Sequence, residues 1–300
     1  MTDRTAALAA LAARLAASFA GLADKPEETP EGTARALWLA AAGVSVSVEA
    51  AASAALPELG AEGTAALEAL AVRRLGGEPL AHITGRQRFM GLDFLAGPEA
   101  LVPRKETELL GRLALGKLQA ARAAGSAPLA IDVCTGSGNL AVALAVHVPD
   151  ARLHAADLSP EAVALARRNA DLHGVGDRIV FADGDLFAPL PRAALARAAD
   201  LVVCNPPYIS SAKVETMPEE IARFEPRLAF DGGAFGLSIV GRLTKEAPDF
   251  LKPGGWLCFE IGKGQGPYWQ KTLGRMSAYR ALETVADADG DIRALAAEAL

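Results

Sequence analysis

The sequence lacks an excess of basic residues and contains few cysteines. Its 300 residues include 30 lysines and arginines against 36 aspartates and glutamates, a formal net charge of −6. Proteins that hold a nucleic-acid backbone usually show a basic balance or patch, so direct nucleic-acid binding is not expected.

The three cysteines, Cys134, Cys204 and Cys258, are far apart in apolar runs without metal-ligand spacing. They predict buried reduced thiols rather than a disulfide or zinc site, no obligatory metal, and a cytoplasmic location.

The sequence also lacks an apolar run long enough to span a bilayer. The most apolar later stretch, residues 36–48, is too short for a transmembrane helix. The alanine-rich N-terminus is interrupted by Arg14, and leucines such as Leu8, Leu11 and Leu15 recur at helical spacing. We therefore expect an amphipathic helix there instead of a secretory signal, and no membrane association. Apolar residues make up 51% of the chain, which predicts a sizeable core.

Hydrophobic periodicity predicts a helical domain, a linker and an α/β domain. Residues 1–80 predict a small helical domain, either a substrate-recognition unit or a packing or dimerising bundle, and residues 81–103 predict a β-hairpin linker. Residues 104–300 start with a helix and then alternate between apolar strands and helices, as in a doubly wound parallel sheet. The expected helices are 1–22, 30–43, 48–56, 64–75, 104–118, 140–147 and 160–173, and the expected strands are 129–133, 152–156, 179–182, 201–204 and 256–261. A final hairpin is expected over 281–297, with a helix over 292–300 as the alternative.

A glycine-rich turn follows the first strand of the predicted sheet. Its candidate ligand-binding residues are Asp132, Cys134, Thr135, Gly136, Ser137 and Gly138. Glycines let the backbone approach a ligand closely, and amides at the start of the following helix can face its polar groups. Similar turns serve NAD, FAD and phosphate sites or are plain tight turns, so this turn alone does not identify a ligand.

Acidic residues follow the second and third predicted strands. Asp157 ends the second strand, where a carboxylate can accept from both ribose hydroxyls of a nucleoside; alternatively it only caps the next helix. Asp185 follows the third strand and can accept from an adenine amino group, with Leu186 and Phe187 as an apolar wall. The alternative for this segment is a polar turn with two core anchors. Together with the glycine-rich turn, these positions favour a cofactor that contains a nucleoside.

The fourth strand leads directly into Asn205, Pro206, Pro207 and Tyr208. The Asn205 carboxamide offers one acceptor and two donors, while the prolines restrict the backbone and donate no hydrogen bond. We expect the Asn205 oxygen and the Pro206 carbonyl to accept from one NH2 group, with Tyr208 stacked on a planar amide or base. Two acceptors can orient a poorly nucleophilic nitrogen toward a sulfonium methyl group without a metal or a strong base. The structural alternative is a turn that merely ends the strand.

These features together resemble a known enzyme family. The glycine-rich turn, Asp157 and residues 205–208 resemble class I methyltransferases that modify planar NH2 groups, and more closely the HemK/PrmC family of release factor N5-glutamine methyltransferases. Further similar segments are 79–85, 89–94, 102–104, 106–108, 225–229, 251–256 and 260–262, so the resemblance covers about residues 78–298. The sequence departs at Cys134, where the family usually has glycine, at Lys105, where it has proline, and at Asn139, where a small apolar residue is common.

The resemblance implies a fold, a cofactor and a methyl acceptor. The fold is α/β, with a Rossmann-like seven-stranded class I methyltransferase domain after a small all-α domain and a β-hairpin linker. The implied cofactor is S-adenosyl-L-methionine, and the residues expected to contact it are Asp132, Cys134, Thr135, Gly136, Ser137, Gly138, Asp157, Asp185, Leu186 and Asn205. The implied acceptor is a glutamine in a Gly-Gly-Gln loop of peptide chain release factors, held by residues 205–208.

Other functions remain as alternatives at this point. The acceptor can be an amide or amine of another protein or small molecule, or an exocyclic amino group of a nucleic-acid base, since the same tetrapeptide serves base amines. The acidic balance argues against the base. From other classes, a nucleotide-sensing scaffold with a decayed site and a Rossmann dehydrogenase fit less well, because neither explains the tetrapeptide.

Overall fold

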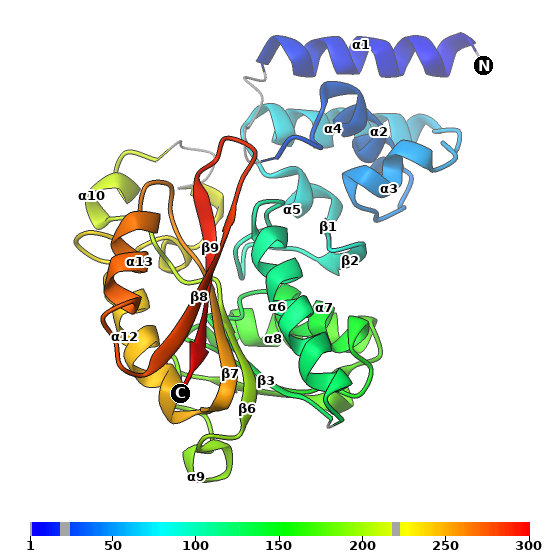
Figure 1. Ribbon diagram of the computed structural model, residues 1–300. Helices are drawn as coiled ribbons and strands as arrows, with labels where there is room; N and C mark the ends of the chain where they lie inside the picture. The colour runs from blue at the N-terminus through cyan, green and yellow to red at the C-terminus, as the bar shows by residue number, and fades with distance from the viewer. Residues whose placement is uncertain (1, 19–24, 126, 218–222) are drawn as a thin grey trace. The chain divides into compact units, whose positions relative to one another are not determined.

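The computed structural model describes residues 2–18, 25–125, 127–217 and 223–300 and divides into two compact units (Figure 1). The described parts of Met1–Pro98, Val102–Lys105 and Pro218–Glu225 form the first unit. The described parts of Glu99–Leu101, Glu106–Met217 and Pro226–Leu300 form the second unit. These units are defined by how compactly the chain packs and not by function. The expected domain boundaries at residues 80 and 103 therefore stay a prediction.

The first unit is helical, as the sequence predicts. Its helices are α1 (Thr2–Ser18), α2 (Pro30–Ala41), α3 (Val48–Ser53), α4 (Ala61–Leu75) and α5 (Leu80–Thr84), of which α5 is not predicted. The side chains of Thr29 and Ser47 cap α2 and α3 by accepting from the amide three residues on, at 3.0 and 3.3 Å. Leu11 and Leu15 are buried in a core shared with the other helices, which confirms an amphipathic α1. The expected continuation of α1 to Leu22 lies outside the described residues.

A β-hairpin follows α5. Strands β1 (Arg86–Phe89) and β2 (Leu92–Leu95) pair antiparallel. Met90 and Gly91 form the turn with φ of 47° and 82°, and a two-residue hairpin loop with positive φ at both positions matches the twist of its strands. The predicted hairpin is confirmed, although it is shorter than expected because α5 takes up the residues before it.

Ion pairs hold the chain that follows the hairpin. Lys105, at a position where the family usually has proline, pairs with Glu49 of α3. Arg104 Nη2 donates to Glu225 Oε1 at 2.5 Å, and the Val102 amide donates to Glu225 Oε2 at 3.0 Å. Lys105, which stands where the family usually has proline, therefore has a specific ionic partner in Glu49 of the first unit.

The second unit is built on a seven-stranded sheet. The strand order is β5-β4-β3-β6-β7-β9-β8; the first five run parallel, and β9 is antiparallel to both of its neighbours. The strands are β3 (Leu129–Val133), β4 (Arg152–Asp157), β5 (Ile179–Asp183), β6 (Ala199–Cys204), β7 (Leu251–Glu260), β8 (Tyr279–Ala286) and β9 (Ile292–Ala299). The predicted fold class and the five predicted strands are confirmed. The final hairpin is also confirmed, and the alternative helix over 292–300 is wrong because these residues pair as β9.

Helices cover both faces of this sheet (Figure 1). On one face lie α6 (Thr107–Ala123), α7 (Asn139–His147) and α8 (Pro160–Leu172), and on the other α12 (Ser238–Glu246) and α13 (Gly266–Leu273). Shorter elements are α9 (Arg192–Leu195), α10 (Ser211–Val214), η1 (Gly176–Arg178), η2 (Arg227–Ala229) and η3 (Ala247–Asp249). The sequence predicts α6, α7 and α8 but misses α12 and α13. None of the described helices has both the length and the hydropathy needed to cross a membrane.

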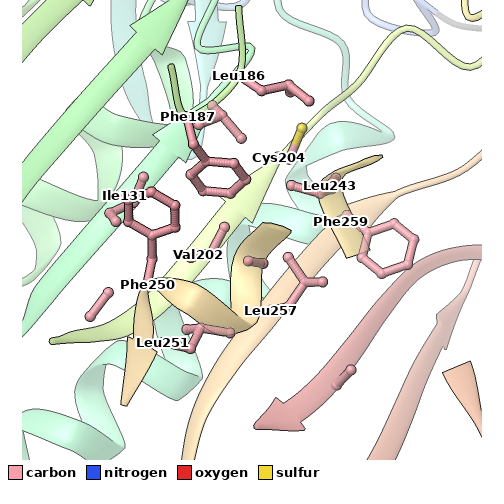
Figure 2. Close-up of a cluster of buried hydrophobic side chains, with 14 of the residues drawn as sticks. Ile131, Leu186, Phe187, Val202, Cys204, Leu243, Phe250, Leu251, Leu257 and Phe259 are labelled. Atoms are coloured by element: carbon pink, nitrogen blue, oxygen red, sulfur yellow. The ribbon is translucent and has the colours of Figure 1, made fainter. Parts of the chain in front are cut away.

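The core of the second unit packs α12 and α13 against the sheet. Ile131 and Val202 from neighbouring strands are fully buried there with Leu243 of α12 (Figure 2). The rings of Phe187 and Phe250 stack with centroids 4.6 Å apart. Close packing of this kind keeps the strands rigid, so the loops at the strand ends are presented by a fixed frame.

Candidate active site

The predicted site residues meet at the carboxyl edge of the sheet, around β3. The glycine-rich turn follows β3, Asp157 ends β4, and Asn205 follows β6. Because β3 lies between β4 and β6, Val133 is paired with Ala156 on one side and with Cys204 on the other. The strand order reverses at this point, and open α/β sheets bind ligands at such a switch point. The structure therefore brings the turn and the tetrapeptide to adjacent strand ends.

Hydrogen bonds and close packing hold the glycine-rich turn. The Thr135 amide donates to a carbonyl of β4 at 3.0 Å, and the Gly136 amide donates to Asp157 Oδ2 at 2.8 Å. Gly136 and Gly138 adopt left-handed φ values of 55° and 78°. A Cβ at Gly138 would lie 2.9 Å from the Cβ of Ala166 on α8, so glycine is required both for the conformation and for the packing of α8.

Asp157 joins the turn to the start of α8. Its Oδ1 accepts from the Ser159 amide at 3.0 Å. The cap of α8 is Ser159 itself, whose Oγ accepts from the Ala162 amide at 3.1 Å, so the interpretation that Asp157 only caps this helix is wrong. Burial raises the pKa of Asp157, whereas the backbone amides of Ser159, Gly136 and Leu158 lower it. The carboxylate has acceptor sites beyond these amides. The ribose contact of Asp157 stays a prediction.

Asp132 is fully buried beneath the turn. Its Oδ2 accepts from Thr135 Oγ1 at 2.6 Å and from an amide of α7 at 3.1 Å, whereas Oδ1 has no hydrogen-bond partner among the described residues. Burial raises the pKa of Asp132 to about 7, and the charge of Asp157 adds to this rise. Two neighbouring carboxylates favour a cationic ligand at this edge. Within the described ranges, His, Cys, Asp and Glu side chains form no group of three or more suited to a metal ion.

Two residues of this region differ from those usual in the family. Cys134 has φ of 60°, so it keeps the left-handed backbone shape that glycine adopts easily. Asn139 begins α7, and its Oδ1 accepts from Ser137 Oγ at 3.5 Å. The Ser137 carbonyl in turn accepts from Asn169 Nδ2 at 2.9 Å.

Cys134 lies against Cys204 at the ends of neighbouring strands. Burial, followed by the Cys134 side chain, raises the pKa of the Cys204 thiol well above its usual value. These two cysteines are far apart in the sequence but close in the fold, because β3 and β6 are adjacent in the sheet. All three thiols are free; Cys204 and Cys258 are buried as predicted, whereas Cys134 is half-buried.

We expect the Cys134→Gly variant to have a higher free energy of unfolding than Cys134→Ala, by about 1 kcal/mol, because a left-handed residue strains alanine and not glycine. Both variants lack the thiol, so the lost contact with Cys204 cancels in the comparison, which urea titration measures. The same pair of substitutions at Cys258, inside β7, should give the opposite order, since glycine weakens a strand. Equal stabilities at position 134 would contradict the strain.

The segment after β5 contains both exposed and buried residues. Asp185 is exposed, and its two oxygens accept from Arg242 Nη1 of α12 at 3.0 and 2.8 Å. Leu186 has φ of 49°, and its side chain is buried in the core beside Phe187 (Figure 2). The Leu186 and Phe187 side chains thus anchor the core, as the alternative interpretation predicts. The adenine contact of Asp185 and a cofactor contact of Leu186 stay predictions.

The polar side chains of the tetrapeptide are held from the interior. Asn205 Nδ2 donates to Thr107 Oγ1, at the start of α6, at 3.1 Å. Tyr208 Oη donates to Glu260 Oε1, at the end of β7, at 2.9 Å. The hydrogen bond to Thr107 engages the nitrogen of the Asn205 carboxamide and not its oxygen. The contact of Asn205 Oδ1 with a substrate NH2 group stays a prediction. Stacking of the Tyr208 ring on a substrate stays a prediction.

Residues from later in the chain clamp the backbone of the tetrapeptide. Gln265 Nε2, just before α13, donates to the Tyr208 carbonyl at 3.2 Å. A Cβ at Gly262 would lie 3.2 Å from Tyr208 Cδ2, and a Cβ at Gly236 would lie 2.0 Å from the Tyr208 carbonyl oxygen. A Cβ at Gly232 would lie 2.5 Å from the carbonyl oxygen of the preceding proline. The tetrapeptide therefore fits only because these positions have no side chain.

A buried charge cluster lies next to Tyr208. Burial raises the pKa of Glu260 to about 7, the hydroxyl of Thr107 lowers it, and the charge of Glu106 raises it. Arg293 Nη1 pairs with Glu106 Oε2 at 2.8 Å, and its Nη2 lies 4.0 Å from Glu260 Oε1. Burial and the charge of Glu260 raise the pKa of Tyr208 well above its usual value, so the phenol stays protonated and donates.

Sequence reasoning assigns no role to Thr107, Glu260, Gln265 or Arg293. Thr107 and Glu260 do stand in segments that carry the family resemblance, and Glu260 ends an apolar strand, a position where a carboxylate is a signal of function. Gln265 and Arg293 lie where no local pattern singles them out. Their contacts become visible only in the folded chain.

Comparison with known proteins gives four findings. The family profile described as Methyltransferase small domain matches residues 111–224. A Geobacter sulfurreducens protein named release factor glutamine methyltransferase is 43% identical over 207 residues, which cover 69% of each chain. A Bradyrhizobium diazoefficiens protein named ribosomal protein uL3 glutamine methyltransferase is 38% identical over 212 residues, 68% of this chain and 64% of its own. Among solved structures, the hMettl16 catalytic domain in complex with MAT2A 3′UTR hairpin 6 shares the fold with a TM-score of 0.52, at 16% identity over 81% of this chain and 84% of that chain.

Proposed function

Because the chain belongs to the family of the release factor glutamine methyltransferases, we propose that it methylates the side-chain amide nitrogen (N5) of a glutamine in the Gly-Gly-Gln loop of peptide chain release factors. It is an S-adenosylmethionine-dependent N-methyltransferase. The observation that carries the proposal is the orientation of Asn205: Thr107 engages Nδ2, which leaves Oδ1 to accept from an amide. A cytoplasmic site of action follows from this substrate.

The residues at the sheet edge fit S-adenosylmethionine, which supplies a methyl group on a sulfonium and also carries an ammonium group. Cationic groups suit the unpartnered Oδ1 of buried Asp132 and the nearby charge of Asp157. A Cβ at Gly136 would meet no atom within 4 Å, so the turn is open on that side. The proposed contacts are Asp132, Cys134, Thr135, Gly136, Ser137, Gly138, Asp157, Asp185, Leu186 and Asn205.

The chain's own residues orient the acceptor nitrogen. An amide nitrogen is a weak nucleophile because its lone pair is delocalised into the carbonyl. Asn205 Oδ1 and the Pro206 carbonyl accept its two N–H groups, which turns the lone pair toward the methyl group and stabilises the positive charge that develops on nitrogen. Pro207 fixes the backbone, and the Tyr208 ring supports the plane of the amide. The methylated nitrogen then loses its proton readily, so no strong base is needed.

We propose that the helical domain, residues 1–80, recognises the protein substrate, with the hairpin linker 81–103 joining it to the methyltransferase domain 104–300. The support is chemical. Glutamine side chains are common in proteins, so the contacts of residues 205–208 with one amide do not distinguish the target from others. Selecting one glutamine requires a second contact surface, and no residue of the proposed chemistry comes from the helical domain.

The test is incubation with methyl-labelled cofactor and purified release factors, followed by mass spectrometry of the labelled peptide. We expect label on the glutamine of the Gly-Gly-Gln loop and none on a release factor in which that glutamine is alanine. Ribosomal protein uL3 and single-stranded oligonucleotides serve as competing acceptors. Label on uL3 or on a nucleic-acid base, with an unlabelled release factor, would overturn the proposed substrate.

A further inference from the structure

Two buried residues connect the polar side chains of the tetrapeptide. Thr107 Oγ1 accepts from Asn205 Nδ2 at 3.1 Å. A hydrogen bond from the same hydroxyl lowers the pKa of Glu260. Glu260 Oε1 accepts from Tyr208 Oη at 2.9 Å. Thr107 and Glu260 are only 1% and 2% exposed, so bulk water does not compete for these hydrogen bonds and each is stronger than it would be at the surface.

The carboxylate fixes the direction of the hydrogen bonds along this path. An ionised carboxylate can only accept, so Thr107 donates its single hydroxyl proton to Glu260. Thr107 then has only lone pairs to offer Asn205, which means that it can accept from Nδ2 but cannot donate to Oδ1. The two ends of the Asn205 carboxamide are nearly identical in shape, so this network, rather than packing, decides which end turns inward.

We infer that Thr107 and Glu260 are positioning residues that set the amide orientation of Asn205, so that an acceptor and not a donor faces the substrate nitrogen. The inference rests on the proposed function, which requires Asn205 Oδ1 to accept from the substrate NH2 group. With the carboxamide reversed, Nδ2 would face that NH2 group. Two donors would then meet, the hydrogen bond would be lost, and the lone pair would no longer be oriented.

The protonation state of Glu260 then controls this orientation. The charged and titratable groups that face Glu260 are Tyr208, Glu106, Arg293 and, at 3.7 Å from Arg293, Asp287. Burial raises the pKa of Glu260 to about 7. Below that pH the protonated carboxyl can donate to Thr107, which frees the Thr107 proton for Asn205 Oδ1. We therefore expect kcat to fall as the pH is lowered through about 7, the value to which burial raises this pKa.

The first experiment compares Thr107→Val, which keeps the shape but lacks the hydroxyl, with Thr107→Ser, which restores it. With the release factor as substrate, Thr107→Val should lower kcat by about 10- to 100-fold, and Thr107→Ser should stay within about threefold of wild type. The Kd for S-adenosylmethionine should change by less than about threefold in both. The matched control is Thr244→Val, because the Thr244 hydroxyl donates within its own helix to the Gly241 carbonyl; it should keep wild-type kcat.

The second experiment measures the pH dependence of kcat for Glu260→Gln. A carboxamide at position 260 can donate at every pH, so kcat should be low throughout and its rise with pH near 7 should disappear. A wild-type pH profile in Glu260→Gln overturns the inference, as does wild-type kcat in Thr107→Val. If Thr107→Val does not fold, the pH profile of Glu260→Gln still tests the inference. A wild-type enzyme that leaves the release factor unmethylated overturns both the proposed function and this inference, whereas an active wild type with an unaffected Thr107→Val overturns the inference alone.

Discussion

Replacing Asn205 with alanine is expected to lower kcat by about 10²- to 10³-fold, because it removes the oxygen that we propose holds the substrate nitrogen as charge develops. The Kd for S-adenosylmethionine should change by less than about threefold, because Asn205 is only one of the ten proposed cofactor contacts and the glycine-rich turn and Asp157 are untouched. Single-turnover assays with labelled cofactor measure the first quantity, and titration calorimetry measures the second. A loss confined to kcat is the signature of an interaction made with the reacting group.

Asn139→Ala is the matched control for this loss. Asn139 begins α7, and its side chain contacts Ser137 rather than the tetrapeptide. The resemblance noted from the sequence places a small apolar residue at this position, so kcat should stay within about threefold of wild type. Equal losses in the two variants, or full activity of Asn205→Ala, would contradict the role of Asn205.

The second large loss is expected from Gly236→Ala. The added Cβ would lie 2.0 Å from the Tyr208 carbonyl oxygen, and Gly236 has φ of +67°. The left-handed strain alone costs about 1–2 kcal/mol, but the contact with Tyr208 also forces the tetrapeptide to move. Because a displacement of about 1 Å can lower a rate by about 100-fold, kcat should fall by at least that factor. Enzyme assays and urea titration separate the loss of activity from the loss of stability.

Gly290→Ala separates strain from displacement. Gly290 has φ of +87°, and a Cβ there would meet no atom within 4 Å. The strain of a left-handed alanine should lower the free energy of unfolding of Gly290→Ala by about as much as the same strain does in Gly236→Ala. Gly290→Ala should nevertheless keep wild-type kcat. If Gly236→Ala were as active as Gly290→Ala, the tetrapeptide would not depend on the empty space at position 236.

Those parts of the site that follow a strand end could be predicted from local sequence. A short apolar run followed by glycines marks the turn after β3, and the acidic Asp157 marks the end of β4. The tetrapeptide that starts at Asn205 is recognisable because two prolines directly after a buried strand are unusual. Each signal lies within a few residues of the strand that positions it, and parallel strands bring their carboxyl ends to one edge.

The contacts that orient the tetrapeptide could not be predicted in this way. Asn205 and Thr107 are 98 residues apart, and Tyr208 and Glu260 are 52 apart. Which strands become neighbours is decided by the whole sheet, so no local pattern shows that a threonine at the start of α6 meets an asparagine after β6. The proximity of Cys134 to a second cysteine was missed for the same reason.

The missed helix α13 has a local cause. It is only eight residues long and begins with Gly266 and a proline, a pair typical of a turn. Proline is nevertheless well suited to the first turn of a helix. Burial of Trp269 and Leu273 against the sheet supplies the stabilisation that so short a helix lacks by itself.

Strand β9 lies between β7 and β8 although it comes last in chain order. Arg293, which β9 contributes, pairs with Glu106 and donates to the Ile261 carbonyl. During translation, every recognisable motif is therefore made before the strand that completes the charges around Tyr208. A nascent chain that ends before Arg293 therefore contains all the proposed catalytic residues but lacks the guanidinium that pairs with Glu106.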